Sequence, residues 1–195
     1  DFLVVLDHQD ADTPKHFHLG ILGDTGMSAY FGLTDIGQPK AGETVVISAA
    51  GGAVGYVAGQ IAKLMGASRV VGLTSSDSKG ERLKSELGYD AFINYHEPNL
   101  DQKFSTACPD GIDVYFDNVG GEHFDAALAT SNEWARYAIC GVIDVYNDFK
   151  AQPMQYLPMI IGKRITIKGF LYPDFYSQVP EFNTDMAALI TSGAV

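Results

Sequence analysis

Short apolar runs alternate with longer helical patterns along the chain from Glu43 onward. In the helical segments the apolar positions recur every three or four residues, as between Val54 and Met65, which is the spacing of one buried helix face. This alternation is typical of a parallel sheet whose strands are joined by crossover helices. The predicted strands are 44–48, 69–73, 91–94, one that begins with 114–116, 136–140 and 165–169; the predicted helices are 54–65, 78–87, 100–108, 122–129, a short one within 154–161, and 184–191.

Six strands with right-handed crossovers predict an α/β fold of the doubly wound (Rossmann) type, a parallel sheet with strand order 3-2-1-4-5-6. Residues 1–195 are interpreted as this one domain. Before Glu43 the pattern predicts only a helix over 27–36 that ends at Gly37. Residues 1–22 have no clear periodicity, and we interpret them as the tail of a separate domain.

A glycine-rich turn lies between the first strand and its helix, in the run AAGGAVG over 49–55. In the G-x-G-x-x-G pattern of dinucleotide-binding folds, Ala50 takes the first position, Gly52 the second and Gly55 the third. Gly52 would let a pyrophosphate approach the backbone, and Gly55 would let the helix pack closely on the strand. The amides of the first helical turn would then face the anion. The alternative is a turn that only connects a strand to a helix.

The end of the second strand indicates which nucleotide is preferred. An NAD site needs an acidic side chain there to accept a hydrogen bond from the ribose 2′-hydroxyl. The strand instead ends in Thr74, Ser75 and Ser76, and Asp77 is expected to cap the next helix. Lys79 follows within one turn, and hydroxyls beside a cation favour a 2′-phosphate. The prediction is therefore NADP(H), with an ordinary solvated lysine as the alternative interpretation of Lys79.

Charge and cysteine content exclude several other classes. The chain has 13 Lys and Arg against 24 Asp and Glu, a net charge of −11, which argues against nucleic-acid and membrane partners. Glycine is more frequent than usual: its 21 residues make up about 11% of the chain, against roughly 7% in an average protein. Cys108 and Cys140 are too few for a disulfide framework or a four-cysteine zinc site, and His16 and His18 lack partners for a metal. We expect a cytoplasmic protein without a metal.

Five motifs in order carry a family resemblance. They are GQPKAGETVVISAAGGAVG (37–55), GQIAKLMGASRVVG (59–72), ELGYDAFINY (86–95), GIDVYFDNVGG (111–121) and AICGVIDVYN (138–147). Together they resemble the zinc-independent medium-chain dehydrogenase/reductases, in the branch of the prostaglandin reductases (leukotriene B4 12-hydroxydehydrogenases) and the alkenal reductases. Members of this branch use NADPH to reduce the carbon–carbon double bond of α,β-unsaturated ketones and aldehydes. The resemblance implies that this chain is their cofactor-binding domain, without the N-terminal GroES-like domain, and that it need not be active by itself.

The resemblance also assigns cofactor-binding positions. The pyrophosphate would lie on Gly52, Ala53, Val54 and Gly55, with Lys79 at the 2′-phosphate and Tyr95 packing at the same end of the nucleotide. Asn118 follows the fourth strand at the topological switch point, where a ligand contact is expected on physical grounds as well; a turn asparagine is the alternative. The loop that contains Cys140, Gly141 and Tyr146 would run under the nicotinamide ribose, Phe170, Leu171 and Tyr172 would line the nicotinamide, and Ser28 would lie near the carboxamide. Asp24 and Thr25, just before Ser28, depart from the Met-Pro usual in this branch.

Reduction of an enone requires hydride transfer to the β-carbon and a hydrogen-bond donor for the charge that develops on the carbonyl oxygen. Tyr146 is the candidate catalytic donor, together with the ribose 2′-hydroxyl; a surface-loop tyrosine is the alternative. An NADPH-binding module without catalysis and a quinone reductase remain rival functions.

The sixth strand, 165–169, comes last in the predicted order, so one of its edges has no partner within the chain. We expect a homodimer by antiparallel pairing of this strand across a two-fold axis. The alternative is that the segment from Phe170 to Tyr176 folds back over the edge.

Overall fold

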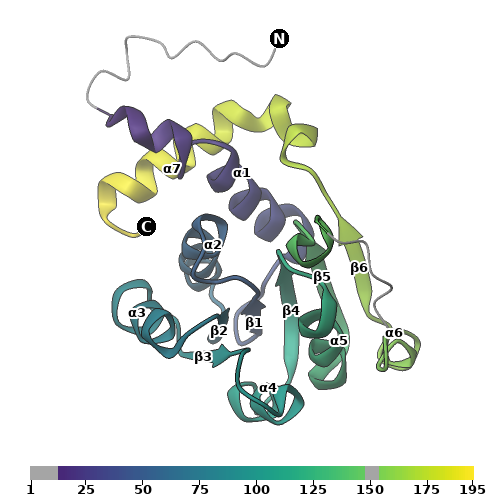
Figure 1. Ribbon diagram of the computed structural model, residues 1–195. Coiled ribbons are helices and arrows are strands. Elements are labelled where there is room, and N and C mark those ends of the chain that lie inside the picture. The colour runs from purple at the N-terminus through teal and green to yellow at the C-terminus, as the bar shows by residue number, and fades with distance from the viewer. Residues whose placement is uncertain (1–12, 148–153) are drawn as a thin grey trace.

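Six parallel strands form the centre of the computed structural model, which describes residues 13–147 and 154–195 (Figure 1). The strand order is β3-β2-β1-β4-β5-β6, as predicted, and every pairing is parallel. The topology therefore confirms the doubly wound fold. The strands are β1 (Thr44–Ile47), β2 (Arg69–Thr74), β3 (Ala91–Asn94), β4 (Ile112–Asp117), β5 (Ser131–Ile139) and β6 (Thr166–Gly169).

Helices cover both faces of the sheet (Figure 1). One apolar cluster joins α1, α2 and α7 to one face, and a second joins α4 and α5 to the other. In chain order the helices are η2 (Lys15–Leu19), α1 (Asp24–Phe31), the π-helix η3 (Gly32–Gly37), α2 (Ala53–Leu64), α3 (Asp77–Leu87), α4 (Leu100–Ala107), α5 (Gly121–Thr130), η4 (Ile143–Val145), α6 (Pro158–Gly162), η5 (Tyr172–Gln178) and α7 (Val179–Ser192). None of the described helices is both long and apolar enough to span a membrane.

Helix α2 packs closely on its surroundings because it presents glycine where neighbours approach. A Cβ on Gly55 would lie 2.5 Å from Ala50 Cα, so this glycine lets the first turn of α2 pack closely on the turn that follows β1. A Cβ on Gly59 would lie 2.1 Å from the ring of Tyr89, which fills the space against the helix. The Tyr89 hydroxyl donates to the carbonyl of Gly55 at 2.6 Å. The segment before β3 is thus bonded to the first turn of α2.

Several predicted boundaries were wrong. Strand β5 begins at Ser131 and not at 136, because a polar stretch opens it, and its register with β4 shifts between Ile112 and Val114. Helix α7 begins at Val179 and not at 184, with proline in its first turn. The short helix expected within 154–161 is α6, which begins at Pro158. The N-cap of α3 is Ser76 and not Asp77.

The region before β1 is more helical than the sequence indicated. The helix expected over 27–36 starts at Asp24 and continues into the π-helix η3. At Gly32, where the two meet, a Cβ would lie 2.4 Å from Phe116 and 2.5 Å from Phe170, so the chain needs glycine there. Of residues 1–22, interpreted from the sequence as the tail of a separate domain, residues 1–12 lie outside the described part of the chain.

Strand β6 is the last strand of the sheet, and all four of its residues are exposed. The segment after it does not cover this edge. Instead Phe175 stacks on Phe31 of α1 with ring centroids 4.5 Å apart, and Phe170 packs against Phe116. The alternative in which residues 170–176 shield β6 is therefore wrong for the described residues. Near the start of β6, Trp134 is 64% exposed.

Candidate functional site

The glycine loop presents the N-terminus of α2 to solvent. Gly52 is the N-cap residue with extended backbone, and no side chain caps the helix. Gly52 and Ala53 are exposed and Val54 is half-buried. The first amides of a helix have no intrahelical acceptor, and the helix dipole adds partial positive charge. An uncapped, accessible helix start is a suitable place for a phosphate group.

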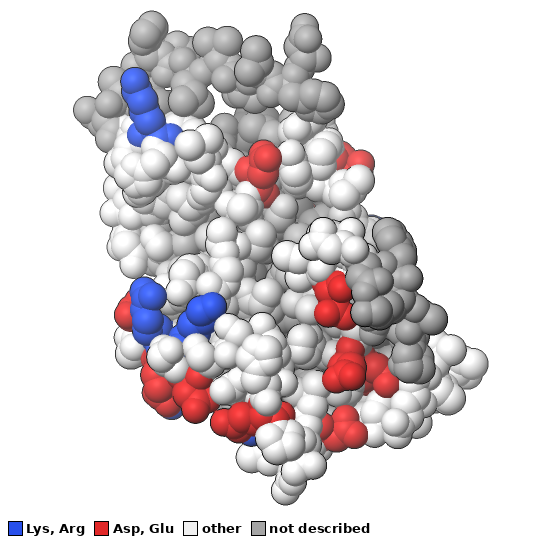
Figure 2. Space-filling view, in the orientation of Figure 1, with Lys and Arg blue, Asp and Glu red and all other residues white. Residues whose placement is uncertain are grey.

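The end of β2 places hydroxyls and a cation beside this loop. Lys79, in the first turn of α3, directs Nζ to within 3.1 Å of Ser75 Oγ. A Cβ built on Gly51 would lie 3.4 Å from Lys79 Cδ, so the lysine stem lies over the glycine loop. On the face shown in Figure 2, basic side chains gather over α3, which contains Lys79, Arg82 and Lys84, whereas acidic side chains dominate below it. The positive charge is local even though the whole chain is acidic.

Between β1 and β4 lies a buried hydrogen-bond network. Asp117, the last residue of β4, is fully buried. Its Oδ1 accepts from Ser48 Oγ at 2.7 Å and from the amides of Val119 and Gly120 at 3.0 and 3.1 Å. Burial raises the pKa of Asp117, and these hydrogen bonds oppose that shift. The carboxylate thereby joins the ends of the two strands at the topological switch point.

Asn118 is fixed by the same network. Its amide donates to Ser48 Oγ at 2.7 Å, and its Nδ2 donates to the carbonyl of Ser48 at 2.8 Å. The side chain is half-buried at the carboxyl end of the sheet, where ligands bind in open α/β folds. Its structural anchoring and its predicted ligand contact are compatible, because the side-chain bond to Ser48 uses the carboxamide nitrogen and leaves the carboxamide oxygen as an acceptor.

A pocket of about 410 Å³ opens where β5 and β6 end. Five of the predicted nicotinamide-side residues line it together: Cys140, Gly141, Tyr146, Phe170 and Leu171. Phe170 is buried and Leu171 exposed, so the pocket has an apolar inner wall and an open rim. Residues distant in the sequence are thus brought to one place by the order of the strands.

Tyr146 caps the short turn η4 at the edge of this pocket. Its side chain is 59% exposed, and its hydroxyl accepts from the amide of Val142 at 3.2 Å. The phenol proton is not used in that bond. It remains available to an acceptor in the pocket.

Ser28 and Tyr172 do not line the 410 Å³ pocket. The Ser28 hydroxyl donates to the carbonyl of Asp24 at 2.7 Å, and its polarity partly opposes the rise that burial causes in the pKa of the Cys140 thiol. The Tyr172 hydroxyl donates to Asp24 Oδ2 at 3.0 Å. Asp24 thus turns the Tyr172 hydroxyl toward α1.

Tyr95 lies just after β3, near the start of α5. Its ring centroid is 4.6 Å from that of His96 and 4.6 Å from that of His123. Burial lowers the pKa of His123, whose Nδ1 is buried without a hydrogen-bond partner. A neutral histidine and a tyrosine therefore form an aromatic surface at the same end of the sheet as Lys79.

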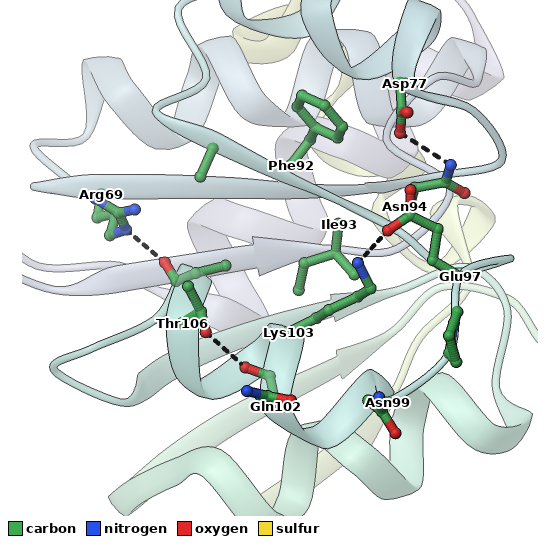
Figure 3. A pocket seen from close by; sticks show the side chains of 13 residues that line it. Arg69, Asp77, Phe92, Ile93, Asn94, Glu97, Asn99, Gln102, Lys103 and Thr106 are labelled. Carbon is green, nitrogen blue, oxygen red and sulfur yellow. Dashed lines mark hydrogen bonds and ion pairs between the residues drawn. The ribbon is translucent and has the colours of Figure 1, made fainter.

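A larger pocket of about 690 Å³ lies along the outer edge of β3 (Figure 3). Its polar groups are engaged within its own wall: Asp77 accepts from Asn94 at 2.9 Å, Arg69 donates to the carbonyl of Ala107 at 2.6 Å, and Lys103 pairs with Glu97. None of the predicted site residues lines it. Size alone does not make it the functional site, because the predicted chemistry lies elsewhere.

Sequence reasoning missed Asp117 and His123. An acidic residue at the end of an apolar strand, followed directly by Asn118 and two nearby glycines, was the available signal for Asp117. Such a residue is costly to bury unless it is fully hydrogen-bonded. No pattern in the sequence around His123, which comes shortly after the glycine pair 120–121, marked it as part of the site.

Most of the predicted positions, Ser28 and Tyr172 excepted, form a band along the carboxyl ends of the strands. It runs from Lys79 and Tyr95, across the glycine loop and Asn118, to the pocket at the ends of β5 and β6. A dinucleotide fits this arrangement, since an uncapped helix start lies between a cationic end and a half-apolar pocket. Within the described residues, no three His, Cys, Asp or Glu side chains are grouped so as to hold a metal ion.

Comparison with known proteins agrees with this arrangement. The profile of the family described as "Zinc-binding dehydrogenase" matches residues 53–191. The NADP(+)-dependent 2-alkenal reductase of Nicotiana tabacum is 42% identical over 187 residues, which cover 95% of this chain and 54% of that protein. Prostaglandin reductase 1 of Mus musculus is 45% identical over 168 residues, covering 85% of this chain and 50% of that protein.

The solved structure of CurA from Vibrio vulnificus in complex with NADPH superimposes with a TM-score of 0.87 at 38% identity, covering 94% of this chain and 56% of that one. The chain spans about half the length of the relatives it matches. It belongs to the family described as zinc-binding dehydrogenases, in the zinc-independent medium-chain dehydrogenase/reductase branch of the alkenal and prostaglandin reductases.

Proposed function

We propose that this chain is the NADPH-binding domain of an oxidoreductase that reduces the carbon–carbon double bond of α,β-unsaturated ketones and aldehydes. The observation that carries the proposal is the band of site residues at the carboxyl ends of the strands, in which the glycine loop lies between Lys79 and the pocket lined by Tyr146. The similarity of the chain to an NADP-dependent 2-alkenal reductase and to prostaglandin reductase 1 supports the proposal.

The binding roles in this proposal combine the geometry with the family resemblance. The amides after Gly52 hold the pyrophosphate, and Lys79 with Ser75 binds the 2′-phosphate. Tyr95 packs at the adenosine end, Asn118 contacts the cofactor where it crosses from β1 to β4, and Ser28 lies behind Cys140 on the nicotinamide side. The pocket of Cys140, Gly141, Phe170 and Leu171 receives the nicotinamide and the enone, with Tyr172 held beside it by Asp24.

NADPH, when bound, supplies a hydride to the β-carbon of the enone. The electron pair of the double bond would move toward the carbonyl oxygen, where the developing negative charge would need a hydrogen-bond donor, and solvent would supply the proton to the α-carbon. Tyr146 donates a hydrogen bond to that oxygen. Its hydroxyl proton is suited to this because the existing bond, donated by the amide of Val142, uses only the hydroxyl oxygen, as an acceptor.

A homodimer through residues 165–169 and a cytoplasmic location form part of the proposal. The exposed edge of β6 supports the dimer, since unpaired strands tend to recruit another strand.

The decisive experiment mixes the full-length protein with NADPH and a simple enone and follows the loss of nicotinamide absorbance. Turnover with the enone, and a much slower reaction with NADH, is the expected result. NADPH binding without turnover of any enone would favour a binding module without catalysis. Turnover of quinones but not enones would favour a quinone reductase.

A further inference from the structure

The loop from Cys140 to Tyr146 is bonded to the turn after β4. The amides of Cys140 and Gly141 donate to the carbonyl of Asp117 at 2.8 and 3.1 Å. Farther along, the amide of Ile143 donates to the carbonyl of Asn118, and that of Asp144 to the carbonyl of Val119, both at 3.2 Å. Four successive backbone bonds therefore set the position of the loop.

That turn is itself shaped by one buried side chain. The carboxylate of Asp117 accepts the amides of Val119 and Gly120, and Gly120 has a φ of 73°, in the left-handed region. Ser48 completes the arrangement, because its hydroxyl donates to Asp117 and accepts from the amide of Asn118. Loss of the carboxylate would leave these donors buried without an acceptor.

The turn 118–120 and the loop 140–146 approach each other so closely that neither has much room to move. A Cβ on Gly141 would lie 3.3 Å from the carbonyl oxygen of Asn118 and 3.1 Å from the Tyr146 hydroxyl. A displacement of the turn is thus transmitted to the loop and to the phenol. The glycine loop follows Ser48 but also has contacts of its own, among them the bond from the amide of Ala50 to the carbonyl of Leu73 at 2.9 Å.

We propose that Asp117 is a positioning residue for the nicotinamide half of the cofactor site: through Ser48 and the turn 118–120 it holds the loop of Cys140 and Tyr146 in place, while the adenosine half is held independently. The inference rests on the proposed function for the identity of the cofactor. It adds that one buried carboxylate acts on one end of the bound dinucleotide only.

The test compares two probes by calorimetric titration. NADPH occupies both halves of the site, and adenosine 2′,5′-bisphosphate occupies only the adenosine half. Asp117→Ala should weaken NADPH binding by about tenfold, the equivalent of one hydrogen bond, and leave the bisphosphate within about twofold. Ser48→Ala should give a smaller loss of the same kind, and Asp117→Asn, which keeps one acceptor oxygen, should restore most of the affinity.

Lys79→Ala serves as the matched control, because it should weaken both probes. Equal losses for the two probes in Asp117→Ala and Ser48→Ala would show a general structural role and overturn the inference, as would unchanged NADPH affinity in both variants. If Asp117→Ala fails to fold, Ser48→Ala and Asp117→Asn decide the matter by the same comparison. A wild-type protein that binds neither probe would instead contradict the proposed function.

Discussion

Lys79 Nζ lies 3.1 Å from Ser75 Oγ, which places a cation and a hydroxyl together at the end of β2. The two groups converge although they belong to different elements, because Ser76 caps α3 and starts the helix immediately after the strand. A 2′-phosphate at this point would accept hydrogen bonds from both side chains.

Lys79→Ala should therefore weaken NADPH and leave NADH nearly unchanged. One charge-assisted hydrogen bond contributes about 1.5–3 kcal/mol, which corresponds to roughly ten- to a hundredfold in affinity. Calorimetric titration with both cofactors measures the difference. Lys84→Ala, on the same helix, is the control and should change neither affinity. Equal losses of affinity for NADPH and NADH in Lys79→Ala would show that the lysine does not bind the 2′-phosphate.

Tyr146→Phe should lower turnover of a saturating enone in the full-length protein while NADPH affinity stays within a few-fold. Loss of an oxyanion donor typically costs on the order of 10²-fold, and the ribose hydroxyl would reduce that loss. Steady-state kinetics measures it. Tyr176→Phe is the matched control, because Tyr176 is also an exposed tyrosine but does not line the pocket. Turnover equal to wild type in Tyr146→Phe would exclude the tyrosine as a donor.

Cys140 should resist alkylation at neutral pH although it lines the proposed enone pocket. Burial raises its pKa from 9.0 to about 11, which lowers the thiolate fraction by about a hundredfold relative to an ordinary thiol. The iodoacetamide reaction rate of a Cys108→Ser variant should rise with pH toward 11. Because the unfolded thiol ionises first, the free energy of unfolding should fall over the same range. Rapid labelling of folded protein at pH 7 would contradict this.

A strand-paired dimer can be followed with the single tryptophan of the sequence, Trp134, which is exposed near the start of β6. Antiparallel pairing of β6 should bring a second copy beside it and shift its emission to shorter wavelength as concentration rises. Thr166→Pro should weaken the dimer if that amide faces the partner, whereas Thr166→Ala, which keeps the amide, should not. A wild-type chain that light scattering finds monomeric at tens of micromolar would exclude the pairing.

The order of the strands and most of their positions could be predicted because buried parallel strands are almost continuously apolar, as in β1 and β2. The start of β5 could not, since Asn132 and Glu133 are polar residues in an irregular stretch. The cap of α3 was assigned to Asp77 because Ser76 and Asp77 are both good N-cap residues, and only the backbone distinguishes them.

Motif spacing identified the residues of the proposed site, but it did not identify the residues whose hydrogen bonds hold them in place. Asp117 acts through bonds to Ser48, 69 positions earlier, and to the backbone of its own turn. No local pattern marks a contact of that separation. The turn of the Tyr172 hydroxyl toward Asp24 was equally hidden, because it depends on how η5 packs beside α1.

The bond from Tyr89 to Gly55 makes the distance between two parts of the proposed cofactor site a fixed property of the fold. Tyr89 lies just before β3, which leads to Tyr95, and Gly55 belongs to the turn that would receive the pyrophosphate. With the ring wedged against Gly59, neither end can shift without the other. The domain would therefore accept only a nucleotide whose adenosine and phosphates are separated by the distance that Tyr89 fixes between the two parts of the site.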